Sequence, residues 1–157
     1  MTPYLKSAPR NSMHAIIRLY DMLPDAKMNQ RLHEDRFTPR QIIAHLADWE
    51  AILRERMVGT IQWKPYEIKS LDEGQRAIDN QYHMIDVKIS LKRFYSERLK
   101  TLSFVELLPP EAWSEMAHHP DYGAVTVLEQ VQMLSGHDIY HIDQLLEFFT
   151  DQPVGTW

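Results

Sequence analysis

Histidine is the residue type in this sequence that most clearly offers chemistry. The chain of 157 residues has eight histidines and no cysteine, a histidine share about twice that of ordinary composition. His137 and His141 lie four residues apart, so a helix would carry both imidazoles on one face, where they can bind one ion. Chance alone gives about 0.4 such pairs in a chain with this many histidines, so the spacing needs support from position.

His45 is the natural third ligand of such a site. It lies between Ile42 and Trp49 on the apolar stripe of a second predicted helix. A lone core histidine is more often bonded to a carbonyl group than to a metal, and that alternative stays open at this stage. Three inward histidines on two neighbouring helices would offer three nitrogens to one divalent metal and leave a coordination position free, as in catalytic sites.

Three polar residues near these histidines are candidates for orienting a ligand or a substrate. Asp48 lies about one helical turn beyond His45, Gln144 lies about one turn beyond His141, and Asp138 follows the first histidine of the pair. Each is explained as well by solvation or by helix packing. With no cysteine in the chain, a nucleophile would have to come from bound water or from a bound thiol.

The other five histidines carry less weight. His118 and His119 flank a predicted turn at Pro120, where exposure to solvent is expected. Glu115 and His118 make the one Glu-x-x-His pair of the sequence, and it falls in a predicted loop. A carboxylate-bridged di-iron site needs two such pairs on inward helix faces, so that class is disfavoured.

Four segments have the spacing of amphipathic helices, which predicts an all-α four-helix bundle formed by residues 1–157 as a single domain. The second and fourth segments begin at Thr38 and Thr126, each with a capping-box partner three residues later. Their apolar stripes run from Met13 to Leu23, from Ile42 to about Gly59, from Met84 to Val105, and from Val127 to Phe148, with Pro153 closing the last.

Two long connections are predicted, over residues 59–80 and 108–125. The first should contain a short helix after Ser70, and the second a helical turn over 111–116 and a bend at 120–123. Long connections in a small bundle often roof a pocket, for which Trp49, Trp63 and Tyr66 are candidate lining residues. Five glycines, with no Asn-Gly or Asp-Gly pair, predict no tight hairpin. Gly136 is expected to allow a close helix approach.

Charge and hydropathy exclude several classes of partner. The net charge is −5, from 17 Lys and Arg against 22 Asp and Glu, and no basic face that would bind nucleic acid is apparent. No apolar run approaches the roughly 20 residues of a membrane-spanning helix, and no secretory signal is evident. We expect a cytoplasmic protein that acts on a small molecule, with a homodimer possible through apolar helix surfaces.

The two histidine motifs together resemble a known family. The segment 37–50, FTPRQIIAHLADWE, is similar to the second-helix signature of the DinB-like (YfiT-type) metal-binding family, and 136–145, GHDIYHIDQL, is similar to its fourth-helix signature. Residues 119–123 and 126–129 also lie where the family places them. The likeness extends from about Met13 to Phe149, and the two motifs, roughly 90 residues apart, are fairly specific in combination.

This resemblance implies an up-down-down-up four-helix bundle in which His45, His137 and His141 hold one divalent metal, zinc or nickel. It also implies activities found in some relatives, which attach a low-molecular-weight thiol to an electrophile or isomerise thiol adducts. Many members carry histidine directly before the last ligand, where this chain has Tyr140.

Three hypotheses follow. The first is a metal-dependent transferase, using a low-molecular-weight thiol as cofactor, or a hydrolase. The second is a non-enzymatic metal-binding or stress-response bundle protein, and the third is a metal-free bundle that binds a protein partner.

Overall fold

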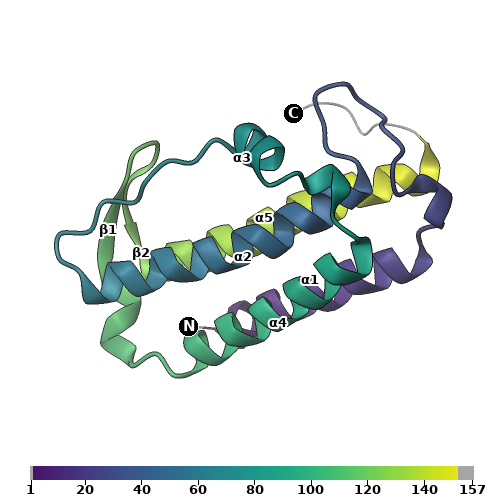
Figure 1. Ribbon diagram of the computed structural model, residues 1–157. Helices are drawn as coiled ribbons and strands as arrows, with labels where there is room; N and C mark the ends of the chain where they lie inside the picture. The colour runs from purple at the N-terminus through teal and green to yellow at the C-terminus, as the bar shows by residue number, and fades with distance from the viewer. Residues whose placement is uncertain (1, 152–157) are drawn as a thin grey trace.

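Four long helices form the protein, which confirms the predicted all-α four-helix bundle with long crossover connections. The computed structural model describes residues 2–151. Helices α1 and α5 run in one direction and α2 and α4 in the other, an up-down-down-up arrangement (Figure 1). None of the described helices is long and apolar enough to cross a membrane. The long helices are α1 (Pro3–Met22), α2 (Pro39–Gln62), α4 (Val87–Glu106) and α5 (Val127–Thr150).

The two helices that carry the histidines begin where the sequence predicts. At α2 the Thr38 side chain accepts the Gln41 N–H at 3.4 Å, and Gln41 Oε1 accepts the Thr38 N–H at 3.0 Å. At α5 Thr126 and Glu129 make the same reciprocal pair at 3.1 and 2.7 Å. A good cap is worth about 1 kcal/mol, so both starts are set by local sequence.

The other two long helices differ from their predicted stripes. Helix α1 begins at Pro3, where Thr2 caps it, well before the apolar stripe that starts at Met13. Helix α4 begins after Asp86, whose carboxylate accepts two backbone N–H groups of the first turn. Met84 therefore lies in the preceding 3₁₀ turn, Tyr82–Met84. Pro153, predicted to close the last helix, lies outside the described residues.

The main apolar core lies between the facing stripes of the four helices. In it α1 packs beside α5, and α2 packs beside α4. Its buried members come from every long helix and include Met13, Ile16, Ile42, Ile43, Leu46, Phe94, Leu145 and Phe148.

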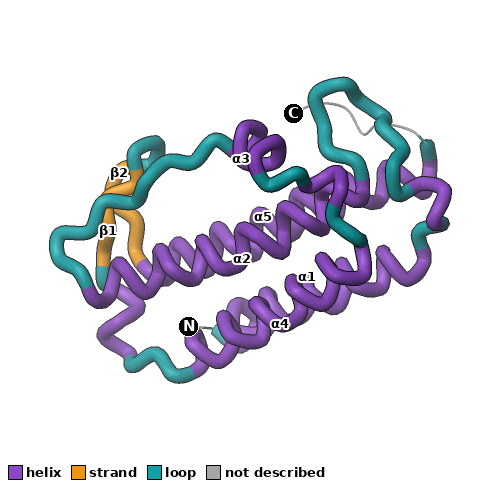
Figure 2. Tube along the Cα trace, viewed as in Figure 1, coloured by secondary structure: helices purple, strands orange, loops and turns teal. Residues whose placement is uncertain are grey.

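The first connection crosses the length of the bundle. After α2 it returns along the outside through the short helix α3 (Glu73–Asp79) and the 3₁₀ turn before α4 (Figures 1 and 2). Helix α3 confirms the short helix predicted after Ser70. A Cβ added at Gly59 would lie 2.4 Å from Cζ of Tyr66, so the connection packs against the end of α2 at a place where only glycine fits. No atom lies within 4 Å of a Cβ added at Gly136, so the close approach expected there is wrong.

The second connection contains a β-hairpin, so the prediction of no tight hairpin is wrong. A 3₁₀ helix, Pro110–Ser114, replaces the helical turn expected over 111–116. It is followed by the antiparallel strands β1 (Met116–His119) and β2 (Gly123–Thr126). Gly123 has φ of +74° and provides the left-handed residue that the tight turn needs.

The two connections are hydrogen-bonded to each other. The Ile68 N–H donates to the His118 carbonyl at 2.9 Å, and the His118 N–H donates to the Tyr66 carbonyl at 3.0 Å. Segment 66–68 thus lies beside β1 and forms a single parallel bridge with it, between Glu67 and His118. This pairing forms a common wall at one end of the bundle.

Candidate metal centre

Three histidines from two neighbouring helices meet inside the bundle. His45 comes from α2, and His137 and His141 come from α5. The Nε2 atom of His137 lies 2.9 Å from Nε2 of His45 and 3.1 Å from Nε2 of His141. One nitrogen from each ring lies within 4.8 Å of the others. The structure therefore brings together the three residues singled out by their spacing and by the family resemblance.

Hydrogen bonds among the rings cannot satisfy this arrangement. A neutral imidazole nitrogen either donates one hydrogen or accepts one, and His137 Nε2 faces two other nitrogens. A cation can be shared by all three nitrogens. Nitrogens bound to one tetrahedral zinc ion lie about 3.3 Å apart, which is close to the two observed separations. The donor set therefore fits a divalent metal.

Burial keeps these imidazoles uncharged. It lowers the pKa of His137 to about 4 and that of His141 to about 3. The pKa of His45, which is fully buried, is lowered further by burial and by the two neighbouring rings. Neutral imidazoles present the lone pairs that a metal needs, so the ring nitrogens are ready to coordinate near pH 7.

Gln144 is the predicted orienting residue that contacts the histidines. Its Oε1 accepts from His141 Nδ1 at 2.8 Å, and its Nε2 donates to the Tyr140 hydroxyl at 3.0 Å. With the proton of His141 held on Nδ1, its Nε2 is left as a lone pair facing the other two rings. Tyr140 thus fixes the Gln144 amide, which in turn orients the His141 ring.

Asp48 makes its contacts elsewhere. Its carboxylate accepts hydrogen bonds from Arg76 at 2.5 Å, from Arg93 at 2.9 Å and from the Tyr82 hydroxyl at 2.7 Å. These hydrogen bonds hold the first connection and α4 against α2. Burial opposes the charged form of Asp48, but the hydrogen bonds of Arg76 and Tyr82 outweigh it, so its pKa lies below the ordinary value.

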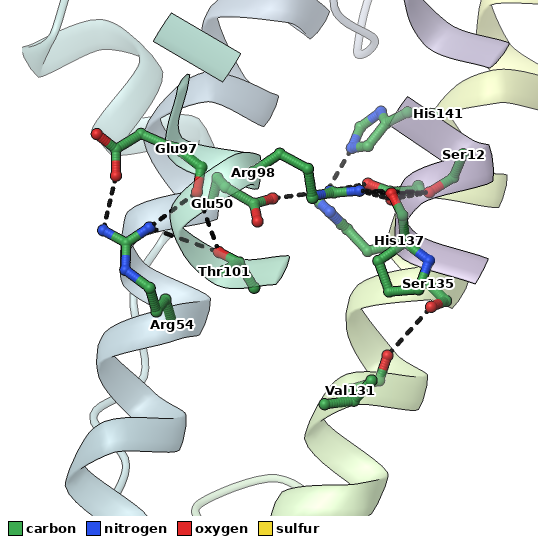
Figure 3. A network of polar contacts seen from close by, with 12 residues as sticks. Ser12, Glu50, Arg54, Glu97, Arg98, Thr101, Val131, Ser135, His137 and His141 are labelled. Atoms are coloured by element: carbon green, nitrogen blue, oxygen red, sulfur yellow. Dashed lines mark hydrogen bonds and ion pairs between the residues drawn. The ribbon is translucent and has the colours of Figure 1, made fainter. Parts of the chain in front are cut away.

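Asp138 belongs to a buried ion cluster next to the histidines. Arg98 donates to its two carboxylate oxygens at 2.7 and 2.9 Å. Arg98 also donates to Glu50 at 2.7 Å (Figure 3). Ser12 also donates to Asp138. The side chains of Arg98, Glu50 and Asp138 are at most 1% exposed. The hydrogen bonds of Asp138 are therefore with Arg98 and Ser12, and within residues 2–151 none is with a histidine ring.

A cavity of about 410 Å³ opens onto His137. Both long connections contribute to it, as predicted. Trp49 lines it, whereas Trp63 is 57% exposed and Tyr66 packs against Gly59, and neither belongs to its wall. The wall includes Trp49 and Arg56 from α2, Leu71 from the first connection, His119 from β1, Tyr122 from the hairpin turn and His137 from α5.

Residues 10–145 match the sequence profile of the DinB superfamily. The chain belongs to the DinB superfamily. Among solved structures, YfiT from Bacillus subtilis, described as a probable metal-dependent hydrolase with an unusual four-helix bundle topology, is similar with a TM-score of 0.87 and 15% identity. That match covers 96% of this chain and 89% of YfiT. No curated protein sequence matches the chain significantly.

The mycothiol-dependent maleylpyruvate isomerase has a similar fold as well. Its structure matches with a TM-score of 0.75 and 16% identity, and a mutant of it matches with 0.75 and 15%. Either match covers 92% of this chain and 63% of the isomerase. At these identities the likeness concerns the fold.

Two residues that line the cavity of this DinB-superfamily chain, His119 and Arg56, were not predicted from the sequence to belong to a site. His119 was expected to be exposed, yet it is 6% exposed because alternate residues of β1 point inward. Its neighbour His118 is exposed, as expected. Arg56 follows Arg54 by two residues and shows no motif; its position in the cavity wall depends on how both connections fold over α2.

Proposed function

We propose that this chain binds one divalent metal, zinc or nickel, through His45, His137 and His141, and that it is a metal-dependent enzyme. The observation that carries the proposal is the convergence of three neutral imidazoles, of which His45 and His141 are buried and His137 is half-buried in the wall of a cavity. A cavity of about 410 Å³ falls in the range of small-molecule sites. A purely structural metal site would be closed by a fourth protein ligand.

The reaction we favour is transfer of a low-molecular-weight thiol to a small electrophilic molecule. A divalent metal with an open position lowers the pKa of a bound water or thiol and so supplies a nucleophile near neutral pH. Gln144 holds the His141 ring with its Nε2 lone pair facing the other two rings, and Trp49 with Leu71 offers apolar surface to the substrate. The chain has no cysteine to act as its own nucleophile.

Hydrolysis is the second candidate, with water in place of the thiol. The description of YfiT as a probable metal-dependent hydrolase favours it, and the dependence of the similar isomerase on mycothiol favours the thiol. A non-enzymatic role in metal binding or stress response is the remaining alternative. It does not explain why a cavity lies beside His137.

The test begins with metal content. Untagged protein purified without chelator is analysed by elemental mass spectrometry beside the variants His45→Ala and His137→Ala. The exposed His14 provides the matched control His14→Ala. We expect about one zinc or nickel per chain in the wild type and the control, and none in the other two variants. Failure to take up zinc or nickel even after reconstitution would overturn the proposal.

The second stage separates the reactions. Metal-loaded protein is incubated with an electrophile such as 1-chloro-2,4-dinitrobenzene, with and without cysteine, glutathione or 2-mercaptoethanol. Thiol-dependent product that is lost in His137→Ala supports the transferase. Turnover of ester or amide substrates without thiol supports the hydrolase, and metal binding without any turnover supports the non-enzymatic alternative.

A further inference from the structure

Arg56 is a cavity residue whose guanidinium is not paired with a carboxylate in the part of the chain that the structure describes. Its guanidinium lies over the Trp49 ring, with Cζ 5.3 Å from the ring centroid, and its Nη2 donates to the Lys69 carbonyl at 3.0 Å. Within residues 2–151 it makes no ion pair. Arg54, two residues earlier on the same helix, is paired with Glu97 at 2.6 Å. Most of the five N–H donors of Arg56 therefore remain free.

The setting of Arg56 makes an anionic partner favourable. The residue is only partly exposed, and burial lowers its pKa against the opposing effect of Tyr66 and Glu73. A partly desolvated guanidinium gains more from a carboxylate than an exposed one does, because water competes less for its donors. Its planar fork also matches the two oxygens of a carboxylate.

His119 provides a second donor on the same cavity wall. Its Nδ1 accepts the Asp121 backbone N–H at 3.2 Å, so the proton of the neutral ring is on Nε2. Nε2 makes no hydrogen bond to any residue that the structure describes. The ring is held in place by stacking on Tyr122, with centroids 4.5 Å apart. One guanidinium and one neutral donor suit a singly charged anion.

The acidic residues of the wall do not neutralise Arg56. Glu73 is exposed, and the side chain of Asp121 is 63% exposed, so water screens both charges. Neither lies within ion-pair distance of Arg56 in the described part of the chain. The rest of the wall has an apolar character through Leu53, Leu71 and Met133.

We propose that Arg56 and His119 form a subsite for the carboxylate of a small organic acid, whose apolar body lies along the cavity and whose other end meets His137. The carboxylate subsite does not depend on a metal. Only the role of the end of the acid that meets His137 rests on the proposed function, since that role requires a metal at the histidines. The carboxylate subsite makes the substrate, or the thiol delivered to it, an acid rather than a neutral molecule.

The test compares hexanoate with hexanamide, which has the same length and no charge. Both are titrated into metal-free and zinc-loaded protein, and binding is followed by calorimetry and by NMR shifts of the Trp49 indole. We expect hexanoate to bind about tenfold more tightly in both forms, which is the effect of one charge-assisted hydrogen bond. Arg56→Gln should abolish the preference, and Arg56→Lys should keep part of it because it retains the charge without the fork.

Two further variants serve as controls. Lys100→Gln removes the same charge from an exposed side chain of α4 and should leave the preference unchanged. Glu73→Gln removes a nearby negative charge and should strengthen hexanoate binding about two- to threefold.

Three results would overturn the subsite: equal or undetectable binding of the two compounds, a preference that survives Arg56→Gln, or a preference seen only with zinc. Zinc content measured on the same samples reports on the metal site separately. A preference in protein that takes up no zinc would keep the subsite and sink the proposed metal function.

Discussion

Two polar clusters lie side by side inside this bundle, and they differ in the charges that they bring together. Arg98 forms ion pairs with the carboxylates of Glu50 and Asp138, and all three side chains are shut off from solvent. The histidine triad carries no opposite charges, has nitrogens that face one another, and opens onto a cavity at His137. The first cluster has its counter-charge within the chain, whereas the second offers three nitrogens that could bind a cation from outside.

The largest effect is expected from a substitution that breaks the ion cluster. Arg98→Met leaves the carboxylates of Glu50 and Asp138 buried without a counter-charge, which costs about 3–5 kcal/mol of unfolding free energy. Urea denaturation measures the loss. Lys100→Met, two residues later on the same helix with a side chain 58% exposed, should cost less than about 1 kcal/mol. Similar losses in both variants would show that the cluster does not stabilise the fold.

The second effect concerns the triad and depends on metal. Zinc at a free concentration 100 times its dissociation constant should raise the unfolding free energy by about 2.7 kcal/mol. His137→Ala should abolish this gain, because two imidazoles hold zinc far less tightly, while His14→Ala should keep it. Denaturation with and without zinc gives the comparison. A gain that persists in His137→Ala would place the metal elsewhere.

A smaller effect tests whether Gln144 orients the His141 ring for metal binding. Gln144→Leu removes the acceptor of His141 Nδ1 and should weaken zinc binding about 10- to 100-fold, the usual cost of losing a partner that orients a ligand. Gln130, also on α5 and also 7% exposed, donates to Thr60. Competition with a zinc chelator should show unchanged affinity in Gln130→Leu, and equal affinities in the two variants would contradict the role of Gln144.

The smallest effect is the dependence of stability on pH that the histidine triad causes in metal-free protein. In the unfolded chain a histidine has a pKa near 6.5, whereas in the folded protein the pKa values of His137 and His141 are about 4 and 3. Between these values the unfolded chain binds more protons, so stability falls as the pH falls. From pH 7 to pH 6 the loss should be on the order of 1 kcal/mol. The double variant His137→Ala/His141→Ala should lose this part of the slope, and an unchanged slope would contradict it.

Sequence patterns were sufficient for the parts of the site that local structure sets. The starts of α2 and α5 depend on capping groups three residues from their partners. The pair His137 and His141 shares a face because a helix repeats every 3.6 residues. His45 stood out as an imidazole where the stripe calls for an apolar side chain.

Other parts of the site could not be predicted from the sequence, because they depend on residues far apart in the chain. Asp48 and Asp138 were candidates for orienting a ligand, yet their partners Arg76 and Arg98 lie 28 and 40 residues away. His119 was placed in solvent because the hairpin that buries it has no Asn-Gly or Asp-Gly signal. Its Gly123 is a single left-handed residue, which composition does not reveal.

The sequence by itself determined four helices, the starts of two of them and the three histidines that face inward. Each of these follows from backbone hydrogen bonds and side-chain periodicity within a few residues. Only the tertiary structure decided which charges pair in the core, that the two connections join into one wall, and that Arg56 and His119 face the cavity beside His137. Burial and ion pairing depend on which segments pack together, and that is settled by the whole chain at once.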